Sequence, residues 1–147
     1  MVGKLLISHP SLLGDPSFGR SVILLVEHND QNSLGFVVNQ PTNYSLNELI
    51  PELNIDLPIY RGGPVDNDRL FYVHTLKDLP NAQAIENKIF WGGELEALQN
   101  QIIEKKIAPD QLRFFLGYSG WGQGQLLNEF NEKSWLLIKN KYNIFEK

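Results

Sequence analysis

Cysteine is absent from this sequence of 147 residues, and its absence excludes several kinds of site. The chain has no disulfide framework, no thiolate nucleophile, no iron–sulfur cluster and no zinc site with sulfur ligands. Long hydrophobic runs are lacking too: Val22–Val26 is the most apolar stretch, far short of the roughly 20 residues of a membrane helix. Leu5–Ile7 is too short for the apolar region of a signal peptide. We therefore expect a cytoplasmic protein with no membrane contact.

Positive charge is also scarce. Thirteen lysines and arginines against seventeen acidic residues give a net charge of −4, with a pI near 5.3. The few arginines are scattered, no basic face emerges, and no two short helices abut as in a helix-turn-helix. Proteins that coat nucleic acid usually carry the opposite balance, so the composition argues against a nucleic-acid partner.

What the chain has is enough apolar material for a core. Apolar residues make up 42% of the sequence and aromatic residues 11%. The length suits one compact domain, and no linker, internal repeat or low-complexity tract divides the chain. We expect a single domain spanning residues 1–147.

Short apolar stretches predict strands. In residues 21–28 both alternating sets of side chains are apolar, which is typical of a strand covered on two faces. A polar break at 29–33 followed by the apolar stretch 34–39 indicates a hairpin. Further strands are predicted at 4–8, 58–61, 69–75, 88–91, 112–118 and 134–138. Strands outnumber helices without regular alternation, so the prediction is an α+β fold with a mixed, largely antiparallel sheet and a few flanking helices.

Three helices are predicted. Ser45 and Glu48 have the spacing of a capping box, and the helix that follows should end or kink early at Pro51. A second helix is expected over 94–106, with lysines 105 and 106 in its last turn. A third, short helix follows the glycines near residue 120, and its side chains Leu126, Leu127 and Phe130 are expected to face inward.

The stretch 117–124, with glycines at 117, 120, 122 and 124, is predicted to be a turn between a strand and a helix. Such a turn can bind an anion through free backbone N–H groups. It lacks the Lys-Ser/Thr of a P-loop and the glycine spacing of a dinucleotide fingerprint. A tight structural turn around Trp121 is the competing interpretation, and the sequence favours it.

Other polar positions are candidate binding or catalytic residues, and each also has a structural explanation. Arg61 beside Gly62 and Gly63 suits a carboxylate or phosphate, or a solvated turn. Asp15 and Arg20 suit a polar site or an ion pair with each other. The histidines, at 9, 28 and 74, lack the spacing of a metal-ligand pair, and Ser119 misses the G-x-S-x-G elbow because Trp121 replaces the last glycine. We therefore predict no catalytic residue, no metal and no cofactor.

Several blocks of the sequence resemble the AlgH/YqgE family of small bacterial proteins. They are, in order, HPSL at 9–12, the segment from Asp15 to His28, GFVVNQP at 35–41, GGPV at 62–65 and GYSGWGQGQL at 117–126. The resemblance runs from about Leu5 to Trp135. Gln40, Ser119 and Gln123 depart from the more usual Arg, Ala and Pro. Because relatives lack a hydroxyl at position 119, Ser119 is not expected to be a nucleophile.

The resemblance implies one α+β domain and a family without an assigned biochemical activity, to which a role in transcriptional regulation is attached. It also implies a set of ligand-binding candidates at the polar and glycine positions of its blocks. With Arg61 added, these are His9, Asp15, Arg20, Glu27, His28, Asn39, Arg61, Gly62, Gly63, Gly120, Trp121 and Gln125.

The function that we expect is a non-catalytic binding or regulatory module for a small molecule or a protein partner. The alternatives are an enzyme acting on a phosphorylated or acyl small molecule, and a transcriptional regulator, which no DNA-binding motif supports. The oligomeric state stays open, because the apolar residues Tyr142, Ile144 and Phe145 suit either a subunit contact or a cover for the core.

Overall fold

The computed structural model describes residues 2–8, 21–86, 88–132 and 135–138. Its elements are, in chain order, β1 (Leu5–Ser8), β2 (Val22–His28), β3 (Ser33–Val37), β4 (Pro41–Ser45), α1 (Leu46–Leu49), β5 (Pro58–Arg61), β6 (Val65–His74), β7 (Gln83–Glu86), β8 (Ile89–Trp91), α2 (Leu95–Ile103), β9 (Leu112–Trp121), α3 (Gln125–Asn131) and β10 (Trp135–Ile138). Short 3-10 turns at Pro51–Leu53 and Pro109–Gln111 complete the set.

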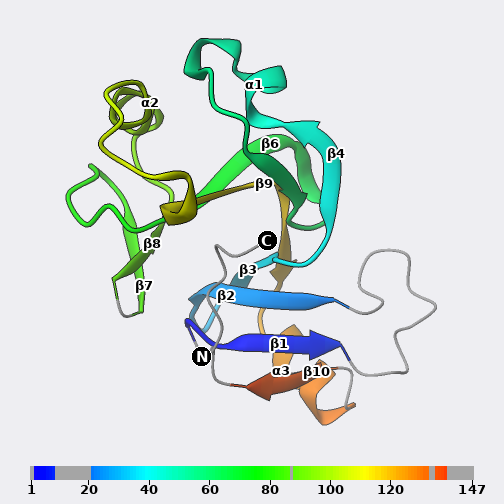
Figure 1. Ribbon diagram of the computed structural model, residues 1–147. Coiled ribbons are helices and arrows are strands. Elements are labelled where there is room, and N and C mark those ends of the chain that lie inside the picture. The colour runs from blue at the N-terminus through cyan, green and yellow to red at the C-terminus, as the bar shows by residue number, and fades with distance from the viewer. Residues whose placement is uncertain (1, 9–20, 87, 133–134, 139–147) are drawn as a thin grey trace.

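The strands form a strongly bent, mostly antiparallel sheet in the order β10-β1-β2-β3-β9-β6-β8-β7, and β5 adds to β9 in parallel and carries β4. In Figure 1, β10, β1, β2 and β3 lie in the lower part of the molecule, and α1 and α2 lie at the top. With three α-helices on this sheet, the fold is α+β as predicted.

Strand β9 joins two parts of the sheet: β10, β1, β2 and β3 on one side, and β5, β6, β8 and β7 on the other. Its first half pairs with β5 and β6, and its second half pairs with β3, placing Trp121 opposite Ser33. The prediction of a turn from Gly117 onward was therefore wrong: residues 117–121 belong to the strand, and the turn is confined to 122–124. Local glycine content suggested a turn, whereas pairing with β3 and β6 supplies the hydrogen bonds that extend the strand.

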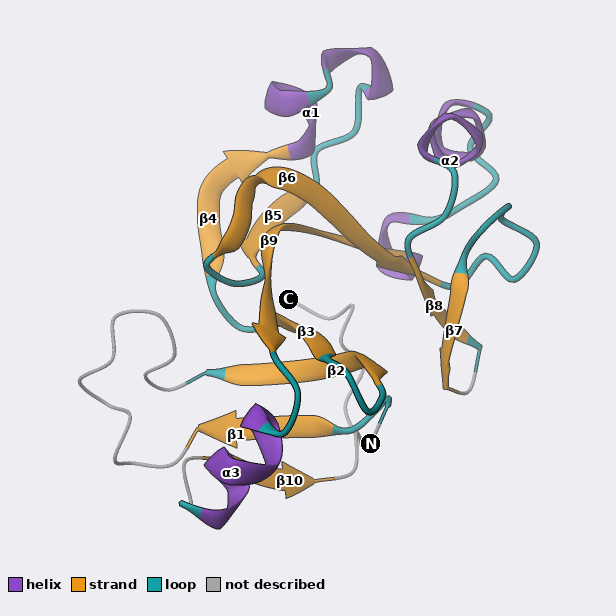
Figure 2. Ribbon diagram, turned by 180° about the vertical axis from the view of Figure 1, so that it is seen from behind, coloured by secondary structure: helices purple, strands orange, loops and turns teal. Residues whose placement is uncertain are grey.

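Three apolar clusters fill the interior. The first lies below α1 and α2 and includes Leu46, Leu98 and Phe114. The second joins the two parts of the sheet, and at its centre the rings of Phe36 and Phe115 stack with centroids 4.9 Å apart. The third lies on the other face of β1 and β2, where α3 covers it; Figure 2 shows α3 in front of β1 and β10.

Local sequence signals account for the start and end of α1. The Ser45 N–H donates to Glu48 Oε1 at 3.1 Å, which completes the predicted capping box. The helix ends at Leu49, because Pro51 lacks an N–H donor and begins a separate 3-10 turn. Helix α2 ends at Ile103, earlier than predicted, so that Lys105 adopts a left-handed conformation beyond it.

Further differences from the predictions are two strands, one side chain and the start of β6, which begins at Val65 instead of at residue 69. Strands β4 and β7 were not predicted, because their sequences, PTNYS and QAIE, are largely polar and exposed. In α3, Leu126 is buried as predicted, but Leu127 is 64% exposed. None of the helices in the described ranges is long and apolar enough to span a membrane.

Candidate functional site

An open groove of about 890 Å³ lies between the β2–β3 hairpin and the start of α3. One side is formed by hairpin residues 28–30 and the other by Gly122–Gly124, and three leucines supply the apolar surface: Leu126, Leu127 and Leu137. The groove therefore brings together a polar segment, residues 28–30, and a glycine-rich segment, Gly122–Gly124, which are far apart in the sequence.

The hairpin side is held in shape by its own turn. The Asn29 side-chain oxygen accepts the N–H groups of Gln31 and Asn32 at 2.8 and 2.9 Å, and the Asn29 N–H donates to the Asn32 carbonyl. Asparagine favours such turns because its side chain substitutes for a backbone acceptor. The turn leaves the Asp30 carboxylate exposed at the groove.

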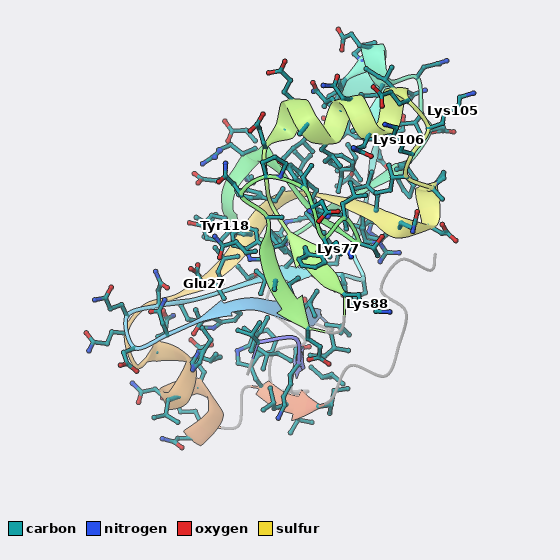
Figure 3. The ribbon with its side chains drawn as sticks, turned by 90° about the vertical axis from the view of Figure 1, so that its left-hand side faces the viewer. Glu27, Lys77, Lys88, Lys105, Lys106 and Tyr118 are labelled. Carbon is teal, nitrogen blue, oxygen red and sulfur yellow. The ribbon has the colours of Figure 1, made fainter. Side chains whose placement is uncertain are left out.

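A β-bulge fixes the position of His28. The pairing of β2 with β3 shifts by one residue between Leu25 and Glu27, after which His28 lies opposite Ser33. His28 Nδ1 and Ser33 Oγ share a hydrogen bond of 2.6 Å, and both residues line the groove. Glu27 precedes His28 in β2, so its side chain leaves the strand on the opposite face; Figure 3 labels it.

The other side of the groove is anchored to two tryptophans. Trp121 and Trp135 are buried, and both indole N–H groups donate to the same oxygen, Glu129 Oε1, at 3.0 and 2.8 Å. The Gln125 side-chain oxygen accepts the Gly122 N–H at 2.9 Å. Trp121 and Gln125, both sequence candidates, are not among the residues that line the groove; they hold the Gly122 turn and α3 in place behind it.

Asn39 and Arg61 lie at the other end of β2, on the order of 20 Å along the strand from His28. The Asn39 side-chain oxygen accepts the Val22 N–H at 3.0 Å. Gln40 links the Arg61 guanidinium, at 3.3 Å, to the Ser21 hydroxyl, at 3.0 Å. The candidate residues therefore divide between two polar clusters instead of forming one.

Gly62 and Gly63 follow the end of β5, where the chain runs close beside its parallel partner β9. A Cβ on Gly62 would collide with the Gly117 carbonyl oxygen, and one on Gly63 with the backbone of Tyr118. The Gly62 carbonyl accepts the Val37 N–H at 2.9 Å and the buried Ser119 hydroxyl at 3.1 Å. Close packing of backbones accounts for both glycines and gives Ser119 a structural contact.

The remaining candidates are placed as follows. Gly120 lies in β9 opposite Leu34, outside the groove lining. His9, Asp15 and Arg20 lie outside the described residues, as do Phe130's side chain and the apolar residues Tyr142, Ile144 and Phe145.

The described histidines do not meet. His74 pairs with Leu112 at the start of β9, whereas His28 lies near its end, on the order of 30 Å along the strand. His74 is fully buried, with Nε2 2.8 Å from the Gly92 carbonyl and Nδ1 accepting the Leu76 N–H at 3.1 Å. Burial lowers its pKa, which the Gly92 hydrogen bond partly opposes. No three His, Asp or Glu residues within the described ranges form a metal-binding group.

Sequence reasoning missed Asp30, Ser33 and Leu137 as groove residues. The polar break at 29–33 identified a hairpin, but nothing in the sequence places that hairpin beside α3 and β10. That proximity arises because β9 pairs with β3 and then leads directly into α3.

Comparison with known proteins gives a consistent set of relatives. A family model described as AlgH-like matches residues 5–147. A UPF0301 protein of Bacteroides fragilis is 41% identical over 95% of this chain and 71% of its own length. One from Chlorobaculum parvum is 44% identical over 90% of this chain and 72% of its own length. These names state no substrate or activity.

Two solved structures share the fold, each with a TM-score of 0.76. The solution structure of the AlgH protein from Pseudomonas aeruginosa is 31% identical, covering 95% of this chain and 77% of that one. The crystal structure of protein DIP2367 from Corynebacterium diphtheriae is 23% identical, covering 98% of this chain and 83% of that one, and at this identity it supports the fold alone. From the match along almost its whole length, the chain belongs to the AlgH-like family.

Proposed function

We propose that this chain is a non-catalytic binding module and that the groove between the β2–β3 hairpin and α3 is its ligand site. The observation that carries the proposal is the meeting of two sequence blocks, around His28 and around Gly122, at one groove. These are the blocks in which the sequence has the motifs EHN and GWGQGQL. The cytoplasm is the proposed setting, which the cysteine-free composition suits.

The size and chemistry of the groove support a small molecule as the ligand. Its volume of about 890 Å³ lies within the usual range of ligand sites, about 300–1,000 Å³. Exposed leucine side chains provide apolar contact, and the His28–Ser33 pair and Asp30 provide a few polar groups. Apolar walls with few polar groups are the common pattern of ligand pockets.

The test is a thermal-shift screen of a metabolite library on the wild-type chain and two variants. Leu127→Gln changes an exposed groove leucine, and Leu95→Gln changes an exposed leucine on α2, which does not line the groove. A groove ligand at a hundredfold excess over its Kd should stabilise the fold by about 2.7 kcal/mol. We expect the shift to persist in Leu95→Gln and to shrink in Leu127→Gln.

Two results would contradict the proposal: a complete library without a shift, or shifts that Leu127→Gln leaves unchanged. The enzyme alternative has one specific observation in its favour, the short hydrogen bond between His28 and Ser33 at the groove. Turnover of a bound compound by the wild type, lost in Ser33→Ala, would establish that alternative instead.

A DNA ligand is not part of the proposal. The net charge is −4, and α2 and α3 are separated by the whole of β9. Lys77 lies between β6 and β7, Lys88 between β7 and β8, and Lys105 and Lys106 just beyond α2; these four lysines do not gather beside α3 (Figure 3). DNA-binding surfaces instead concentrate their positive charge on one face.

A further inference from the structure

We infer that the preferred ligand of the groove is an amphipathic amine, with its aliphatic part on the leucines and its protonated nitrogen at Asp30. This inference rests on the proposed function, because it assigns a ligand class to the same groove. It follows from the groove's charge, from the hydrogen-bonding groups still available there and from the position of the leucines.

The first step is the charge of the groove. Among the described residues that line it, Asp30 is the one carboxylate and there is neither lysine nor arginine. Asp30 takes part in neither of the ion pairs found within the described ranges, Arg69–Asp66 and Lys106–Glu104. An exposed carboxylate that no described cation pairs with favours a cationic group over an anionic one.

The second step is the supply of acceptors. The side-chain oxygen of neighbouring Asn29 is engaged by two backbone N–H groups of its own turn. Ser33 Oγ is engaged with His28 Nδ1. The Asp30 carboxylate is thus a charged acceptor at this end of the groove that no described group occupies, and an ammonium carries three N–H donors for it.

The third step concerns the opposite side, where an anion would have to bind. The Gly122 N–H, a natural donor for an anion at a glycine-rich turn, already donates to Gln125 Oε1 at 2.9 Å. A phosphate or carboxylate at this side would find the Gly122 N–H already engaged and would face Asp30 across the groove. The charge and the occupied donor therefore both make this side less favourable for an anion than for a cation.

The fourth step is the apolar surface. Leu127 is 64% exposed and Leu137 is 37% exposed, with buried Leu126 between the helix and the sheet. These side chains extend from α3 to β10, on the side of the groove away from the hairpin. An aliphatic chain lying on them would remove their apolar surface from water, which is favourable in proportion to the area covered.

The experiment compares decylamine, decanol and decanoate, which share one aliphatic chain and differ in the head group. Each is titrated below its critical micelle concentration at about pH 8, where an amine is still protonated and free imidazole is neutral, and the tryptophan fluorescence of the protein is followed. An exposed charge pair contributes modestly, so we expect decylamine to bind about two- to fivefold more tightly than decanol. Decanoate should bind most weakly.

Three variants separate the head group from the groove. Asp30→Asn should make decylamine and decanol bind equally, whereas Asp78→Asn, an exposed carboxylate outside the groove lining, should keep the wild-type order. Leu127→Gln should weaken all three probes by a similar factor.

The outcomes distinguish this inference from the proposed function. Tightest binding of decanoate, or an amine preference that survives Asp30→Asn, would overturn the amine ligand while leaving the groove as a binding site. Absence of binding by every probe, or binding that Leu127→Gln does not weaken, would count against both.

Discussion

At the scale of single residues, Glu129 joins three elements through one oxygen atom. One of its carboxylate oxygens accepts the indole N–H groups of Trp121 and Trp135, whose rings meet edge to face with centroids 6.1 Å apart. The two tryptophans come from β9 and β10, so this helical side chain ties α3 to both strands. Its spacing to Trp121 and Trp135 gave no sequence signal, because the contact depends on the packing of three elements.

We predict that Glu129→Ala lowers the free energy of unfolding by about 2–3 kcal/mol, because it leaves two buried indole donors without their shared acceptor. Glu132→Ala, an exposed glutamate just beyond the same helix, is the matched control and should change stability by less than about 0.5 kcal/mol. Urea unfolding followed by tryptophan fluorescence measures both. Equal effects of the two substitutions would contradict a role for the shared hydrogen bonds.

His74 predicts how stability depends on pH. Burial lowers its pKa below the ordinary 6.5, so the folded state favours the neutral ring. Above about pH 6.5 the ring is neutral in both states; as the pH falls below this value, the unfolded chain takes up a proton that the folded chain resists. The contribution of His74 to the free energy of unfolding should therefore decrease on acidification through this range.

Denaturant unfolding at a series of pH values tests this prediction. His74→Gln should flatten the slope below about pH 6.5, because it removes the titrating group. His28→Gln changes an exposed histidine at the groove and serves as the control, in which the contribution of His74 persists. An unchanged slope in His74→Gln would show that other groups cause the pH dependence.

At the scale of elements, the paired strands at the centre and the first part of β9 could be predicted, and the end of β9 could not. Apolar alternation identified 21–28 and its hairpin with the next strand, because both patterns are local. Residues 117–121 have a glycine-rich local sequence, and their partners, β3 and β6, are distant in the chain. Long-range pairing therefore decided the structure where local preference pointed to a turn.

The same distinction explains the candidate site. Sequence blocks supplied His28, Trp121 and Gln125, whereas the leucines of the groove and Asp30 depend on how α3 packs beside the hairpin. Asn39 and Arg61 resembled the other candidates in sequence but lie at the opposite end of β2. The sequence therefore indicated which residues were candidates, but which of them lie together depended on the topology of the sheet.

Gly117 allows a matched test of the close contact between β9 and the Gly62–Gly63 segment. Gly117 and Gly124 have nearly the same left-handed backbone, with φ of +75° and +74°. A Cβ at 117 would collide with the Gly63 carbonyl oxygen, whereas one at 124 would meet nothing within 4 Å. Both alanine substitutions carry the backbone cost of about 1–2 kcal/mol, so the excess for Gly117→Ala measures the collision.

We predict that Gly124→Ala destabilises the fold by about 1 kcal/mol and Gly117→Ala by more than about 3 kcal/mol. Equilibrium unfolding gives both values; if Gly117→Ala fails to yield folded protein while Gly124→Ala folds, the order holds as well. Similar losses in the two variants would show that β5 and β9 can move apart at little cost.

At the scale of the whole molecule, β9 is the strand that the two parts of the sheet have in common. It pairs with β3, β5 and β6, and Phe114 and Phe115 point into two different apolar clusters. At the far end of the sheet, β7 pairs with β8 and is mostly exposed. Opening of β9 therefore disrupts both parts, whereas opening of β7 disrupts little.

Native-state hydrogen exchange should rank these strands. We predict the strongest protection for the amides of residues 113–116 in β9, at the level of global unfolding, and the weakest strand protection in β7. Protection in β7 equal to that in β9 would indicate that the sheet opens only as a unit. We expect β6 and β8, which lie between β9 and β7 in the sheet, to show intermediate protection.

The pairing of β1 with β10 has a consequence for biosynthesis. Leu5 lies opposite Ile138, so β1 acquires one of its two neighbours only after β10, about 130 residues further along the chain, has been made. β2 and β3 can form their hairpin early, but the edge of β1 that faces away from β2 stays unpaired until β10 is available. An unpaired strand edge of a nascent chain is a site for association with other chains. Slow translation of the part of the chain before β10 should therefore increase its demand for chaperones.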